Sequence, residues 1–94
     1  MNNEIKLNED ENLDEWQTRK YTEFFSEECD FLKRRLERGK TDLADLEGIL
    51  ESLYIFDDNN QDGRSLIMQL SLSASIAAYE SIISKLKNEA KKTQ

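Results

Sequence analysis

Apolar residues recur every three or four positions through the middle of the chain. This first seam consists of Phe25, Cys29, Leu32, Leu36, Leu43, Leu46, Leu50 and Leu53. Such spacing keeps one stripe of an α-helix turned toward a neighbouring helix. A second seam follows near the carboxyl end and comprises Leu72, Ile76, Tyr79, Ile83, Leu86 and Ala90. The pattern predicts an all-α fold whose helices pair through these two seams.

Polar residues indicate where the helices begin and end. Asn12 followed by Glu15 is typical of a capping box at a helix start. The segment from Asp57 to Gly63 consists mostly of turn-forming residues, which predict a reversal of the chain. We therefore expect an antiparallel helical hairpin, with a long helix over residues 12–57 and a last helix over residues 65–90.

The sequence around Gly39 allows two interpretations: the long helix continues through this residue, or it ends there and a new helix begins. The apolar spacing passes through Gly39 without losing phase, and one interior glycine costs only about 1 kcal/mol relative to alanine. Against this, basic residues before Gly39, with Thr41 and Asp42 after it, are typical of a helix end followed by a new helix start. The continuous helix predicts a dimerising hairpin, because the last helix is too short to cover it. The alternative is a three-helix bundle.

Composition limits the class of protein. The chain has 94 residues, with 13 basic and 20 acidic side chains, a net charge of −7 and no proline. These numbers predict one small helical domain over residues 12–92, preceded by a disordered acidic tail over residues 1–11. The negative charge disfavours nucleic acid as a partner. We expect a cytoplasmic protein that binds no membrane, because no run approaches the roughly 18 apolar residues of a membrane span.

The sequence offers little for catalysis. It contains no histidine, the commonest general base, and its single cysteine, Cys29, lies on the first seam. We therefore expect no enzymatic activity, no cofactor and no small-molecule substrate.

The predicted turn resembles the first half of a calcium-binding EF-hand loop. Asp58, Asn60 and Asp62 alternate with other residues and precede Gly63, as calcium ligands do in such loops. The twelfth loop position is Gln69, where an EF-hand has a glutamate. These three residues are weak metal candidates. The other interpretation is a plain turn in which Gly63 is left-handed and Ser65 or Asp62 caps the last helix.

A basic cluster precedes and follows Gly39. Its members are Lys33, Arg34, Arg35, Arg38 and Lys40, and residues 33–40 carry a net charge of +4 when Glu37 is counted. We expect these residues to complement a helix dipole and to pair with the acids after residue 42.

Residues 65–79 carry no charge and are apolar on two helix faces, which predicts covering on two sides. A second stripe of aromatic residues lies near the amino end. The expected partner-binding residues are Leu66, Ile67, Leu70, Ala74, Trp16, Phe24 and Phe31.

The predicted function is a small acidic helical protein–protein interaction module, an adaptor or chaperone-like subunit that binds itself as a homodimer or another protein. The alternatives are a weak EF-hand-like calcium-responsive switch and a structural coiled-coil component of a larger assembly.

Overall fold

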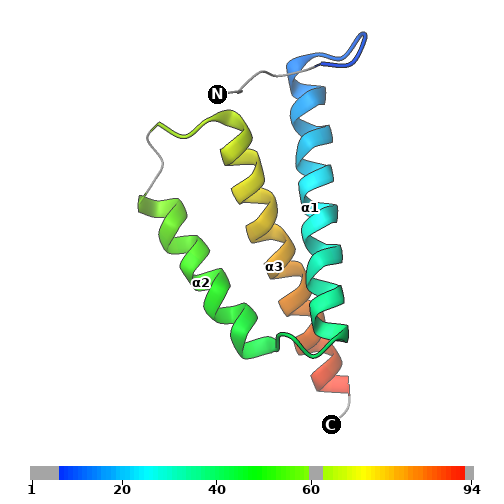
Figure 1. Ribbon diagram of the computed structural model, residues 1–94, viewed down its shortest axis with the longest axis vertical. Coiled ribbons are helices and arrows are strands. Elements are labelled where there is room, and N and C mark those ends of the chain that lie inside the picture. The colour runs from blue at the N-terminus through cyan, green and yellow to red at the C-terminus, as the bar shows by residue number, and fades with distance from the viewer. Residues whose placement is uncertain (1–6, 60–62, 93–94) are drawn as a thin grey trace.

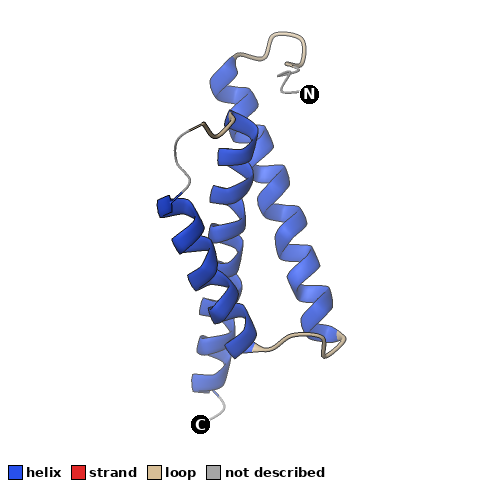
Figure 2. Ribbon diagram, turned by 60° about the vertical axis from the view of Figure 1, so that its left-hand side comes forward, coloured by secondary structure: helices blue, strands red, loops and turns tan. Residues whose placement is uncertain are grey.

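The computed structural model describes residues 7–59 and 63–92, and this part of the chain contains three helices and no strand. They are α1 (Leu13–Glu37), α2 (Leu43–Asn59) and α3 (Leu66–Lys92). The predicted all-α class is confirmed. α1 and α3 run in the same direction and α2 runs in the opposite one, with α3 between the other two helices (Figure 1 and Figure 2). No Cα atom of α1 lies within 8 Å of a Cα atom of α2 among the described residues.

The start of α1 is the predicted capping box. The Asn12 side chain accepts a hydrogen bond from the Glu15 backbone N–H at 2.8 Å, and the Glu15 carboxylate accepts one from the Asn12 N–H at 3.3 Å. These two bonds satisfy backbone donors that a helix start otherwise leaves unpaired. The sequence signal for this helix start is therefore confirmed.

The prediction of one continuous helix over residues 12–57 is wrong, because α1 ends at Glu37. Gly39 has a φ of +69°, and its N–H donates to the Leu36 carbonyl at 3.1 Å. The N–H of Lys40 donates to the Arg35 carbonyl at 2.8 Å. This pair of bonds is the Schellman motif, which closes a helix with a left-handed glycine. The glycine and the basic residues before it were the correct signal.

The three- and four-residue spacing of apolar residues continues through Gly39 because both halves of the first seam, one on α1 and one on α2, pack on α3. Leu32 of α1 and Leu46 of α2 both enter the core that α3 completes. Asp42, rather than Thr41, caps α2, since its carboxylate accepts a hydrogen bond from the Asp45 N–H at 2.9 Å. Three helices are thus observed, as in the alternative interpretation.

The start of α3 follows the plain-turn interpretation at two positions. Gly63 has a φ of +76°, and the Ser65 hydroxyl accepts a hydrogen bond from the Met68 N–H at 3.1 Å. Arg64 joins this turn to the end of α2, because its guanidinium lies 2.8 Å from an Asp57 carboxylate oxygen. The Arg64 side chain is only 3% exposed. It therefore ties α2 to α3 from a buried position.

The hydrophobic core lies where all three helices contribute side chains. Its buried members are Cys29, Leu32, Leu46, Ala78, Tyr79, Ile82 and Ile83. Leu36 and Leu43, on the two sides of the α1–α2 turn, pack against this cluster together with Phe25, Leu50, Leu53 and Leu86. α2 contributes one buried residue, Leu46, whereas α3 contributes four. The central helix therefore organises the core.

Candidate protein interaction surface

Large apolar side chains are exposed along α2. Ile49 is 43% exposed, Ile55 is 56% exposed and Phe56 is 43% exposed. They lie off the seam that packs on α3, and the Phe56 ring also has the Arg64 guanidinium 5.8 Å from its centre. A cluster of exposed apolar side chains on one helix is a typical docking surface.

Small side chains lie among these apolar residues. Ala44, Gly48 and Ser52 follow one another at four-residue spacing and are all exposed. A Cβ atom added to Gly48 would meet no other atom within 4 Å. The Ser52 hydroxyl donates to the Gly48 carbonyl at 3.2 Å, so its donor is satisfied within the helix. A second helix can therefore approach the α2 backbone closely at this stripe.

We call Ala44, Gly48, Ile49, Ser52, Ile55 and Phe56 the outer face of α2. Its apolar members were absent from the binding residues expected from the sequence. The available signal was that Ile49, Ile55 and Phe56 lie outside the first seam, so that α2 is apolar on more than one side. The prediction of a continuous helix placed the uncovered apolar surface on the amino-terminal aromatic residues and not on residues 43–59.

The charges on α2 are all negative. Five acidic residues and no basic residue occur between Leu43 and Asn59. Glu47 pairs with Lys87 at 3.0 Å and Asp57 pairs with Arg64 at 2.8 Å. The other three, Asp45, Glu51 and Asp58, form no ion pair within the described part of the chain. Asp45 and Glu51 each precede an exposed isoleucine by four residues, so acids border the outer face of α2.

A second exposed surface lies on α1 and consists of Lys20, Phe24, Phe31 and Arg35, which we call the α1 aromatic edge. Phe31 is 45% exposed and Phe24 is half-buried. The Arg35 guanidinium lies 5.6 Å from the centre of the Phe31 ring, and the Lys20 ammonium lies 6.0 Å from that of Phe24. Both distances are within the range of cation–π attraction. This edge is therefore both aromatic and basic.

The basic cluster does not pair as expected. Lys33, Arg34, Arg35, Arg38 and Lys40 form no ion pair with an acid of the described residues. Arg34 and Arg35 do lie in the last turn of α1, where the helix dipole favours positive charge. The expected pairing with acids after residue 42 is absent because α1 and α2 diverge across α3 (Figure 1).

The residues expected from the sequence to bind a partner differ in exposure. Trp16 is 1% exposed and Ala74 is 0% exposed, so neither is available on the surface. Leu66, Ile67 and Leu70 are half-buried on α3. Of the expected aromatic residues, Phe24 and Phe31 come together on the α1 aromatic edge and Trp16 does not join them.

α3 contains a long apolar stretch. Its segment Leu66–Lys91 is long and apolar enough to cross a membrane by length and composition alone: an 18-residue window within it has a mean hydropathy of 1.4, and 28% of that window is buried. The expectation that no such segment exists is therefore corrected. The indication is weak, because the core helix of a soluble protein passes the same test.

The described residues contain no group of three or more side chains suited to holding a metal ion. Asp58 is exposed at the end of α2, while Asn60 and Asp62 lie outside the described residues. The calcium site thus stays a prediction. Cys29 is buried in the core, and this burial raises the pKa of its thiol. A raised thiol pKa lowers the fraction of reactive thiolate at neutral pH.

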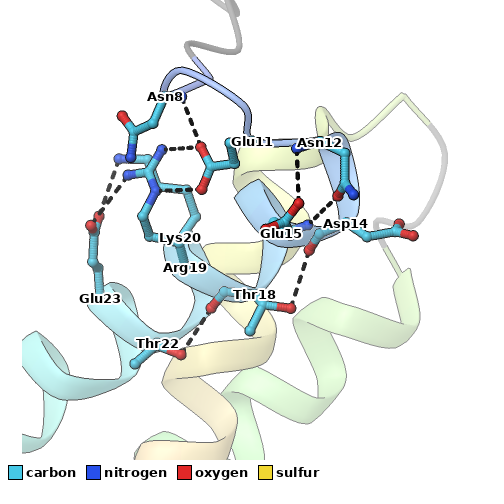
Figure 3. Close-up of polar contacts among 10 residues, drawn as sticks. All are labelled: Asn8, Glu11, Asn12, Asp14, Glu15, Thr18, Arg19, Lys20, Thr22 and Glu23. Carbon is cyan, nitrogen blue, oxygen red and sulfur yellow. Dashed lines mark hydrogen bonds and ion pairs between the residues drawn. The ribbon is translucent and has the colours of Figure 1, made fainter.

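The segment before α1 folds back on its first turns (Figure 3). The Arg19 guanidinium binds both Glu11 carboxylate oxygens, at 2.9 and 3.0 Å, and the Asn8 N–H donates to Glu11 at 2.9 Å. These bonds, that from Arg19 foremost, lower the pKa of Glu11 to about 2. Glu11 of the predicted tail therefore contacts α1, and residues 1–6 lie outside the described residues.

Most of these features concern surfaces that suit another helix. The outer face of α2 combines large apolar side chains with small ones and is bordered by acidic residues. The α1 aromatic edge is bordered by basic residues. Comparisons with known proteins found no family model, no curated protein and no solved structure that matches this chain.

Proposed function

We propose that this protein is a small acidic helical protein–protein interaction module, an adaptor or chaperone-like subunit without enzymatic activity. The observation that carries the proposal is the outer face of α2, where Ile49, Ile55 and Phe56 are each at least 43% exposed. A monomeric soluble protein gains nothing from such a patch, whereas a helix laid upon it removes the apolar area from water.

The surrounding geometry supports a helical partner. The small residues Ala44, Gly48 and Ser52 form a groove in which the backbone of a second helix could lie. The larger side chains of Ile49 and Ile55 form ridges beside this groove. Ridges on one helix that fit grooves on another are the usual packing mode of helix pairs. Burial of the apolar residues would supply affinity, and the acids would set orientation.

A site-specific photo-crosslink tests the proposal. A photoreactive benzoylphenylalanine replaces Ile55 in the protein produced in its native cells, and a parallel sample carries it at Met68, which is 52% exposed on α3. We expect irradiation to join another polypeptide chain to position 55 and not to position 68. Absence of any crosslinked chain at position 55, or equal yields at both positions, would contradict the proposed function.

A further inference from the structure

Two surfaces in the described part of the chain carry opposite charges, most of which form no ion pair there, although Lys20 of the α1 aromatic edge pairs with Glu23 at 3.3 Å. Asp45, Glu51 and Asp58 of α2 have no basic partner among the described residues. The basic cluster over residues 33–40 has no acidic partner there either. α1 and α2 do not approach one another, because α3 lies between them (Figure 1). The two sets of charges therefore do not meet one another within the described part of one copy.

Each charged surface also carries exposed apolar side chains. Phe31, 45% exposed, lies beside Arg34 and Arg35 near the end of α1. Ile55, 56% exposed, lies one turn after Glu51 on α2. An apolar contact ringed by opposite charges combines a driving force with selection of the partner.

We infer that a second copy of this chain occupies the outer face of α2 and that it does so with its α1 aromatic edge. This inference rests on the proposed function, because it names the chain that covers the surface described there. Pairing α2 with α2 of the other copy would bring acids together, and pairing α1 with α1 would bring basic residues together. Of the three pairings, only α1 on α2 joins charges of opposite sign.

Two-fold symmetry makes this contact occur twice. Each copy offers one α1 aromatic edge and one α2 outer face, so an axis that places α1 of the first copy on α2 of the second also creates the reverse contact. A two-fold arrangement of this kind would cover both surfaces in a closed dimer. Two contacts also increase the buried area, and stable interfaces usually bury at least about 1,200 Å² in total.

Two acids of the α1 stripe, Glu27 and Glu28, oppose the inferred contact, and Glu28 is half-buried and accepts a hydrogen bond from the Ser75 hydroxyl at 2.8 Å. Glu27 lies between Phe24 and Phe31 and is exposed on the same side of the helix. In the inferred dimer it faces the acidic border of α2. Its replacement by lysine is therefore expected to tighten the dimer at low salt, a direction that loss of folding cannot produce.

Light scattering over a micromolar to millimolar concentration series tests the inference. We expect the parent chain, of 11.0 kDa, to reach twice that mass. Ile55→Glu on α2 and Phe31→Glu on α1 are each expected to raise the dimer dissociation constant at least tenfold. Met68→Glu places the same charge at a similarly exposed position on α3 and is expected to leave the dimer unchanged.

Mixing the two weakened variants is the decisive step. The Ile55→Glu copy keeps its α1 aromatic edge and the Phe31→Glu copy keeps its α2 outer face, so a mixed dimer has one intact contact and places both glutamates in the other. Each variant alone has a glutamate in both contacts. A contact that one glutamate already breaks loses little more with a second, so the intact contact favours the mixed dimer. We expect the mixture to form more dimer than either variant alone at the same concentration. Circular dichroism confirms that each variant is as helical as the parent.

Several results would overturn the inference. They are a parent that stays monomeric at millimolar concentration, a dimer that tolerates either variant, and a mixture that gains no dimer. A monomeric parent whose position 55 still crosslinks to a different protein in cells would overturn the second copy as occupant and leave the proposed function standing. If the parent forms no dimer and position 55 gives no crosslink, both the inferred dimer and the proposed function are contradicted.

Discussion

α1 and α2 pack on the same central helix but differ in what they bury. α1 buries Trp16, Cys29 and Leu32, whereas α2 buries only Leu46. α2 instead exposes four large hydrophobic side chains, Ile49, Tyr54, Ile55 and Phe56, over 17 residues. The comparison shows that α1 buries more of the core and that α2 exposes more large apolar side chains.

The contacts that hold α2 to α3 at the surface add little stability. Glu47 and Lys87 form an ion pair whose side chains are 45% and 53% exposed, and such pairs contribute about 0–1 kcal/mol. The Tyr54 hydroxyl donates a hydrogen bond to Glu80, which raises the pKa of Tyr54. α2 is therefore held chiefly by Leu46 and the half-buried leucines on its inner side.

The largest effect is expected for Leu32→Ala, which removes a side chain that is 1% exposed where α1 meets the core. Leucine-to-alanine changes at such sites cost about 2–5 kcal/mol through lost burial and the cavity left behind. Urea unfolding followed by circular dichroism measures the change. Thr22→Ala on the exposed side of α1 is the control and should stay within about 0.5 kcal/mol of the parent.

Leu46→Ala should act more locally, although Leu46 is 0% exposed. It removes the one buried anchor of α2, so we expect a loss of about 2 kcal/mol, at the low end for this substitution, with α2 opening before α1 and α3 separate. Amide hydrogen exchange should accelerate over residues 43–59 more than over residues 20–37. Equal acceleration in both helices would show that α2 is as integral to the core as α1.

Gly39→Ala distinguishes the broken helix from a continuous one by the sign of its effect. Because Gly39 has a φ of +69°, alanine there should lower the free energy of unfolding by about 1 kcal/mol. In a continuous helix the same change would raise it by about 1 kcal/mol. Gly48→Ala is the matched control: this glycine is inside α2 with open space around it, so alanine should stabilise the protein.

The smallest effect on stability is expected for Glu11→Gln, in the segment before α1, and its size depends on pH. The pKa of Glu11 falls from 4.5 to about 2, so its stabilisation is complete above pH 4.5 and is lost as the pH falls toward 2. Glu11→Gln should therefore lower the melting temperature at pH 6 and leave it close to that of the parent at pH 2. A difference that persists unchanged at pH 2 would mean that the Glu11–Arg19 contact is not its source.

The sequence by itself determined the all-α class and supplied capping signals at several helix ends, although the apolar spacing through Gly39 led to the wrong prediction of one helix over residues 12–57. Asn12, Gly39 and Ser65 carry this information because capping depends on hydrogen bonds between residues three to five positions apart. The first seam also indicated correctly which leucines of α1 and α2 enter the core, since helical spacing sets which side chains share a face. The second seam did so only in part, because Leu72, Ile76 and Ala90 lie outside the core cluster.

Only the tertiary structure decided which remaining apolar residues are covered. Trp16 and Ile55 are both large and apolar in sequence, yet the first is 1% exposed and the second is 56% exposed. The interruption at Gly39 reverses the chain, so α2 packs on one side of α3 and leaves its outer face uncovered. Periodicity reports the spacing of side chains within one helix, whereas exposure depends on the number of neighbouring helices and on the side from which they approach.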